Sequence, residues 1–231
     1  MRRMFSLSVA PITALTLILT ACGTTTDSGS LTEYSGIIFN DSTGSQLCGS
    51  LAESFPPQCG DPIIRLGDLR LDDVVALQSE GATSWTDYEA GVAGDQSEGV
   101  LTNVVLTDPI IADSASGFTL RIADLGITSG APIVLPIDLR NATDADATLT
   151  FTSGQRVELT LSQDGDEIYR WSATASFIQS VEEVTIAAGE VFGTTLITTP
   201  VDLPPGTFTA QAWITAEEAS DLVVEWTIEV R

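Results

Sequence analysis

The residue types that most often carry enzyme chemistry are scarce in this chain. It has no His, its nine basic residues are all Arg, and its 32 acidic residues give a formal net charge of -23. Without imidazole or Lys, no Ser-His-Asp or Cys-His relay, imidazole-bound zinc or Schiff base is available. The remaining options are pairs of carboxylates, or a hard metal ion held by oxygen ligands.

The carboxylates do not form a convincing catalytic or metal-binding pattern. Glu182-Glu183 and Glu217-Glu218 are adjacent pairs, and neighbours in a strand point to opposite faces. Asp144-Ala145-Asp146 and the run 164–167 offer oxygen ligands for calcium, but neither has the EF-hand loop pattern, so acidic turns are favoured. We therefore expect no enzyme activity, catalytic residue, cofactor or resident metal. The negative charge also argues against nucleic-acid binding.

The N-terminal segment is typical of an export signal. Arg2 and Arg3 precede an apolar run over residues 4–19, and small residues follow. Leu19-Thr20-Ala21-Cys22 resembles the lipobox of bacterial lipoproteins. That resemblance implies a signal peptide over 1–21, cleavage before Cys22 and a thioether lipid on its sulfur. The two arginines leave both the general and the twin-arginine export routes open.

The resemblance to a lipobox also implies a cellular location for the folded part of the chain. Acyl chains contribute about 0.8 kcal/mol per buried methylene, so several of them hold a soluble body stably at a bilayer. The residues after Cys22 show no regular spacing of apolar side chains that would indicate a helix or a strand. We therefore expect 22–34 to include a flexible tether. The expected location is the cell membrane, with the body lipid-anchored and facing outside the cytoplasm.

Two cysteines remain after Cys22. Cys48 and Cys59 form an even pair outside the reducing cytoplasm, which predicts a structural disulfide between them. Their spacing is not that of a C-x-x-C redox motif, and no second Cys or His pair accompanies them in a zinc pattern.

The body of the chain has the pattern of an all-β protein. Short apolar runs, many of them alternating, are separated by Gly, Asp, Asn and Pro. We expect a small β-barrel or β-rich domain over 35–108, with one strand over Trp85–Val92, then a linker over 109–117. An antiparallel β-sandwich should follow over 118–231, with Asp164-Gly165 as a hairpin turn.

Two stretches of the body resemble known domains. The stretch 47–60 resembles the start of uncharacterised domains in actinobacterial lipoproteins, a resemblance that implies no function. The second half resembles the BsuPI family of intracellular proteinase inhibitors. The residues that carry this resemblance are Asn141-Ala142-Thr143, Leu149–Arg156, Tyr169–Ser172, Phe177, Ile186–Glu190 and Leu203–Ala210. It implies an immunoglobulin-like sandwich and binding to a serine proteinase.

The expected contact residues follow from this resemblance. An inhibitor presents an exposed, preorganised segment to the cleft of its proteinase. The stretch Ser172, Ala173, Thr174, Ala175 and Ser176 is the expected binding segment, while Trp171 and Phe177 are expected to anchor the core. The favoured function is a protein-binding module whose partner is an envelope proteinase or another envelope protein. A scaffolding protein without inhibitory activity is the alternative, and a glycan-binding or carboxylate-dependent hydrolytic protein is a third.

Overall fold

Strands make up most of the regular structure in the computed structural model, which describes residues 31–108 and 110–231. The predicted signal peptide over 1–21 and the lipidated Cys22 lie outside the described residues. Leu31–Arg231 form one compact unit, and the expected all-β class is confirmed. No helix among the described residues is both long and apolar enough to cross a membrane.

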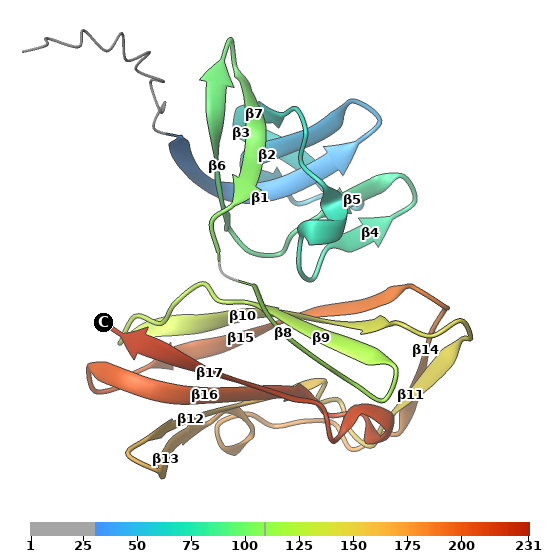
Figure 1. Cartoon of the computed structure of the whole chain (residues 1–231), viewed down its shortest axis with the longest axis vertical. Coiled ribbons are helices and arrows are strands. Elements are labelled where there is room, and N and C mark those ends of the chain that lie inside the picture. The colour runs from blue at the N-terminus through green and yellow to red at the C-terminus, as the bar shows by residue number, and fades with distance from the viewer. Residues whose placement is uncertain (1–30, 109) are drawn as a thin grey trace, which may run out of the picture. The chain divides into compact units, whose positions relative to one another are not determined.

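The first seven strands form one sheet, and five of them close into a small barrel (Figure 1). They are β1 (Thr32–Asp41), β2 (Gly44–Ala52), β3 (Gln58–Leu66), β4 (Gln78–Glu80), β5 (Thr83–Trp85), β6 (Ala90–Ser97) and β7 (Val100–Leu106), with a 3₁₀ turn η1 (Leu71–Asp73). β1 pairs with β6 along its first half and with β2 along its second half. β2 pairs with β3, and β7 pairs with β6 and, in parallel, with β3. These five strands therefore close into a ring, the arrangement of an OB-type barrel.

The other ten strands form a sandwich. They are β8 (Ile110–Ala115), β9 (Phe118–Ala123), β10 (Ala131–Asn141), β11 (Ala147–Phe151), β12 (Val157–Gln163), β13 (Asp166–Arg170), β14 (Glu182–Ile186), β15 (Val191–Val201), β16 (Gly206–Ile214) and β17 (Val223–Val230). One sheet has the order β15-β10-β9-β8 and the other β13-β12-β16-β17, while β11 and β14 form a separate pair. Two 3₁₀ turns, η2 (Trp171–Ala173) and η3 (Glu217–Ala219), complete the regular structure.

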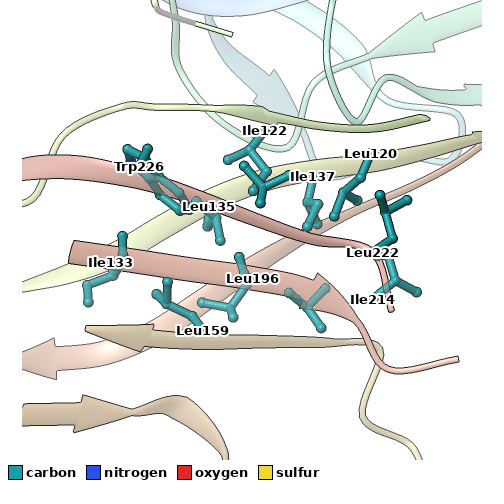
Figure 2. Packing of buried hydrophobic residues seen from close by; sticks show 14 of the residues in the cluster. Leu120, Ile122, Ile133, Leu135, Ile137, Leu159, Leu196, Ile214, Leu222 and Trp226 are labelled. Atoms are coloured by element: carbon teal, nitrogen blue, oxygen red, sulfur yellow. The ribbon is translucent and has the colours of Figure 1, made fainter. Parts of the chain in front are cut away.

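The inward side chains of the two sheets fill the sandwich (Figure 2). Leu120, Ile137 and Leu196 come from one sheet, and Leu159, Ile214 and Trp226 from the other. In β17 every second residue is buried, as strict alternation requires of a sheet with one covered face. Burial of such aliphatic side chains, at about 1.5–3 kcal/mol each, supplies the main stabilisation of the sandwich.

Three sequence expectations need correction. The expected linker over 109–117 contains β8, which pairs with β9 through the hairpin residues Ser116 and Gly117. Both residues have positive φ, as a two-residue hairpin turn of type I′ requires. β8 lies at the edge of its sheet, and most of its side chains are exposed. The end of the expected tether, from Thr32 on, is already part of β1.

The stretch Trp85–Val92 is not one strand. β5 ends at Trp85 and β6 begins at Ala90. Between them, the Thr86 hydroxyl donates to the carbonyl of Tyr88 (2.8 Å) and accepts from the N–H of Ile38 (3.1 Å). These bonds turn the backbone away from an extended path, although the side chains alternate in the sequence.

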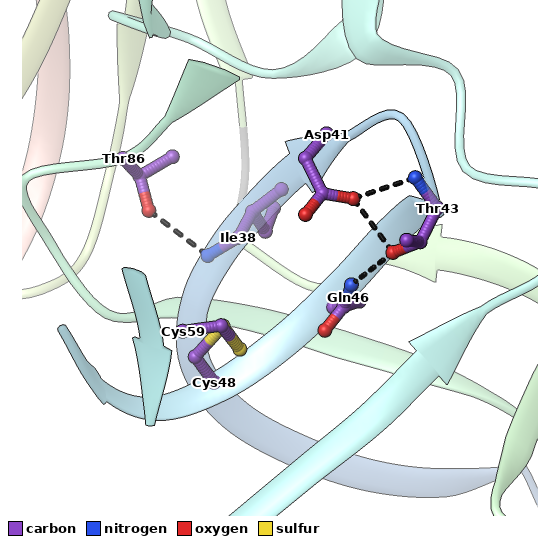
Figure 3. Close-up of a disulfide and its surroundings, with 7 residues drawn as sticks. All are labelled: Ile38, Asp41, Thr43, Gln46, Cys48, Cys59 and Thr86. Atoms are coloured by element: carbon purple, nitrogen blue, oxygen red, sulfur yellow. Dashed lines mark hydrogen bonds between the residues drawn. A yellow bond between two sulfur atoms is a disulfide. The ribbon is translucent and has the colours of Figure 1, made fainter. Parts of the chain in front are cut away.

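The predicted disulfide joins Cys48 of β2 to Cys59 of β3, with Cα atoms 5.4 Å apart (Figure 3). Strand pairing places the two residues near each other, because β2 and β3 are antiparallel neighbours. At the other end of β2, the Asp41 carboxylate accepts from the N–H of Thr43 (2.7 Å) and closes the turn after β1. The disulfide therefore crosslinks two adjacent strands of the barrel.

Candidate functional site

The sandwich carries one long irregular segment among its strands. Residues 174–181 leave η2 and reach β14 without any strand or helix of their own. Two of their apolar side chains face solvent, since Ile178 is 78% exposed and Val181 is 70% exposed. We call this stretch the 174–181 segment.

Several contacts hold the start of the 174–181 segment. The N–H and the hydroxyl of Thr174 both donate to the carbonyl of Trp171, each at 2.9 Å. The rings of Trp171 and Phe177 meet edge to face with centroids 5.1 Å apart. Such aromatic pairs contribute about 0.5–1.5 kcal/mol beyond their buried area. The first turn of the segment is therefore folded back on η2.

A buried carboxylate fixes η2 itself. Glu158 of β12 is only 4% exposed, and its Oε1 accepts from the N–H of Ser172 at 3.1 Å. The same carboxylate accepts from the Nε2 of Gln155 (3.2 Å) and lies 3.7 Å from Nη1 of Arg170. A buried charge is tolerated only with such partners. Arg170 also bonds Glu167, and this hydrogen bond lowers the pKa of the Glu167 carboxyl.

The far end of the 174–181 segment is held by the loop between β11 and β12. The N–H of Gly154 donates to the carbonyl of Ile178 at 2.8 Å. A Cβ on Gly154 would lie 3.3 Å from Cγ1 of Ile178, so glycine permits this close approach. Just after the segment, Glu182 forms an ion pair with Arg156, whose guanidinium lies 4.3 Å from the ring centroid of Phe151. The segment is thus exposed except at the half-buried Ala175 and Phe177, and contacts hold it at its start, at Ile178 and just beyond its end.

The predicted binding residues lie at the start of this feature. Ala173, Thr174 and Ser176 are exposed, whereas Ala175 is half-buried and Ser172 is half-buried with its N–H bonded to Glu158. The most exposed apolar side chains, Ile178 and Val181, lie beyond the predicted stretch. The family resemblance indicated residues 172–176 as the binding segment and did not extend to Ile178 and Val181. The signal that could have found them is a pair of aliphatic residues that fits no strand alternation.

Trp171 and Phe177 are less buried than expected of residues that anchor the core. Both are half-buried and pack on each other, and Trp171 only borders the core. Phe151 and Phe208 are the aromatic residues that are fully buried. The aromatic pair predicted to anchor the core instead shapes the exposed segment.

The acidic residues considered as ligands lie in turns and strands. Asp164 and Gly165 both have positive φ and form the hairpin between β12 and β13. Asp146 accepts from the N–H of Ala188 at 3.2 Å. Across residues 31–108 and 110–231, no group of three or more Cys, Asp or Glu side chains is placed to hold a metal ion.

Comparison with solved structures gives weak, partial likenesses. A β-glucosidase from Listeria innocua in complex with gluconolactone is 15% identical over 52% of this chain and 16% of its own, with a TM-score of 0.30. A Pseudomonas fluorescens alkylpurine DNA glycosylase bound to DNA is 13% identical over 51% and 31%, with a TM-score of 0.31. The CARDB domain of a Pyrococcus furiosus protein, in complex with di-metal ions, is 12% identical over 52% and 90%, with a TM-score of 0.28. The chain thus spans about a sixth of the β-glucosidase, and scores this low carry no argument about function.

The sequence comparison is more specific. No curated protein matches the chain. One protein-family model does match, and it covers less than half of the chain but includes Glu158, Gly154 and the whole 174–181 segment. Residues 123–219 match the family described as BsuPI, intracellular proteinase inhibitor.

Proposed function

We propose that this chain is a lipid-anchored protein of the cell envelope that binds a proteinase through the 174–181 segment. One observation carries the proposal: the part of the chain that matches an inhibitor family holds a segment that is fixed at Thr174 and Ile178 and exposes the apolar side chains of Ile178 and Val181. A segment already ordered before binding loses little conformational entropy in the complex, so more of its contact energy appears as affinity. Preorganisation of this kind is common to proteinase inhibitors.

The proposed anchor rests on the lipobox at Cys22. Leu31, where the described body begins, lies nine positions after Cys22 in the chain, with eight residues between them. Even fully extended, nine residues span about 30 Å. A lipid on Cys22 would therefore keep the body close to the bilayer, where it meets proteinases that act outside the cytoplasm.

Inhibition kinetics test the binding role. The chain from residue 22 onward, with Cys22→Ser to prevent lipidation, is titrated against a panel of serine proteinases that includes a subtilisin-like enzyme. We expect dose-dependent inhibition of the subtilisin-like enzyme that saturates at one inhibitor per enzyme. No inhibition of any enzyme in the panel would remove the inhibitor role and favour the scaffolding alternative.

Mass spectrometry of the protein from its native host tests the anchor. We expect a mature chain that begins at Cys22 and carries a diacylglycerol thioether on the sulfur. An unmodified Cys22 sulfur, or a mature chain that begins elsewhere, would contradict the anchor without affecting the inhibition result.

A further inference from the structure

The apolar side chains of the 174–181 segment differ in how far they are exposed to a partner. Phe177 is half-buried against Trp171, so its ring is already engaged. Val181 is exposed but smaller than Ile178. Ile178 combines 78% exposure with a backbone carbonyl bonded to Gly154, so its side chain projects from a fixed point. An anchor of this kind, aliphatic and fixed before binding, suits an apolar pocket.

The carbonyl of Ile178 has a second consequence. A serine proteinase cleaves a peptide when its catalytic oxygen attacks the carbonyl carbon and N–H donors of the enzyme surround the carbonyl oxygen. The Ile178 oxygen already accepts from Gly154 at 2.8 Å and therefore faces the body of the inhibitor. The backbone of Gly154 therefore packs directly beside this oxygen, and its N–H takes the place of a donor from the enzyme.

From these observations, and resting on the proposed proteinase binding, we infer that Ile178 fills the apolar specificity pocket of a subtilisin-like proteinase while the Ile178–Gln179 bond stays uncleaved. The side chain supplies the affinity, and the bond between the Ile178 carbonyl and the Gly154 N–H withholds the oxygen that hydrolysis requires. The chain then acts as an inhibitor at this position rather than as a substrate.

A matched pair of variants tests the anchor. Ile178→Asp and Phe55→Asp each place a charge at a side chain that is 78% exposed, but Phe55 lies in the loop between β2 and β3 of the barrel. We expect Ile178→Asp to raise the inhibition constant by about 100-fold and Phe55→Asp to leave it within about twofold. Inhibition by Ile178→Asp equal to that of the parent chain would overturn the anchor and leave the proposed function standing. A parent chain that inhibits nothing would remove the proposed function itself.

Intact-mass measurement tests the withheld bond. The parent chain is incubated for hours with an equimolar amount of the inhibited proteinase, and no fragment ending at Ile178 is expected. Gly154→Pro removes the N–H donor, so this variant should be cut after Ile178 if its unfolding temperature shows that it folds. A fragment ending at Ile178 from the parent chain overturns the inference, whatever the fate of the proline variant.

Discussion

At the scale of single residues, Asn141 shows how one buried amide organises a turn of the sandwich. It is fully buried, and its Nδ2 lies within hydrogen-bond distance of the carbonyls of Ala145 (2.7 Å), Ile186 (3.1 Å) and Ala187 (3.3 Å). Its Oδ1 accepts from the N–H and the hydroxyl of Thr143. This one side chain joins the end of β10 to the end of β14.

Replacement of Asn141 by Ala should therefore be costly. The change leaves the carbonyl of the buried Ile186 without this donor and empties a fully buried site, and we expect a loss of about 3 kcal/mol in the free energy of unfolding. Urea denaturation followed by tryptophan fluorescence measures it. Thr148→Ala, at an exposed position of β11, is the control and should cost about 1 kcal/mol or less. Equal stabilities of the two variants would show that the amide does not organise this turn.

Asp108 provides the pH-dependent prediction. Its carboxyl is half-buried and accepts from the N–H of Gly91 at 2.7 Å. Burial raises the pKa of Asp108, and the negative charge of Asp124 raises it further, against the opposing effect of the Gly91 bond. The folded state thus binds this proton more tightly than the unfolded chain does, so stability from this group is present at low pH and lost as pH rises through the raised pKa.

The variant Asp108→Asn keeps an acceptor for Gly91 but cannot ionise. We expect it to unfold at a higher urea concentration than the parent chain at pH 7. The difference should vanish below the ordinary aspartate pKa of 3.8, where both side chains are neutral. Asp144→Asn, at an exposed site, serves as the control. An Asp108→Asn variant that is less stable than the parent chain at pH 7 would contradict a raised pKa for Asp108.

At the scale of elements, the alternation of apolar and polar residues predicted the strands that have one buried face and one exposed face. Val224, Trp226, Ile228 and Val230 alternate with exposed residues, and all four are buried in β17. The turn at Asp164-Gly165 was equally predictable, because both residues tolerate positive φ. β8 was missed because Ile110 and Ile111 are adjacent and its later residues show no alternation of apolar and polar side chains. The prediction that the binding segment ends at Ser176 missed Ile178. Ile178 is held by a hydrogen bond from Gly154, which lies 24 residues earlier in the chain and gives no local signal in the sequence.

The disulfide is the element-scale feature that is most directly testable. It closes the short chain loop between β2 and β3, and restriction of the unfolded chain should stabilise the fold by about 3 kcal/mol. The double variant Cys48→Ser/Cys59→Ser should therefore melt at a lower temperature than the parent chain under oxidising conditions. Addition of a reductant should lower the melting temperature of the parent and leave the variant unchanged. Identical melting of the oxidised parent and the variant would contradict a stabilising role.

At the scale of the whole molecule, a buried ion pair connects elements that are distant in the sequence. Asp138 of β10 is 1% exposed and bonds the guanidinium of Arg121 in β9 through two nitrogens, at 3.0 and 2.8 Å. Asp138 also accepts from the N–H of Ala76 (3.2 Å), and Arg121 donates to the carbonyl of Asp72 (2.8 Å). The two charges thus hold η1 and the chain just after it against the β9–β10 pair.

Removal of one charge of the Arg121–Asp138 pair should lower the free energy of unfolding more than removal of both charges. Asp138→Asn leaves Arg121 without its counterion, and we expect a loss of about 3–5 kcal/mol in the free energy of unfolding. The double change Arg121→Leu/Asp138→Leu removes both charges and should recover part of that loss. Urea denaturation of the three proteins decides the matter. An Asp138→Asn variant at least as stable as the double variant would show that the pairing is energetically unimportant.

The proposed binding role is tested most directly by hydrogen–deuterium exchange of the chain with and without a catalytically inactivated subtilisin-like proteinase. We predict that backbone amides in 174–181 become protected in the complex, while the barrel over 31–108 exchanges as in the free chain. Protection confined to the barrel, or identical exchange with and without the proteinase at saturating concentration, would contradict the proposed binding role.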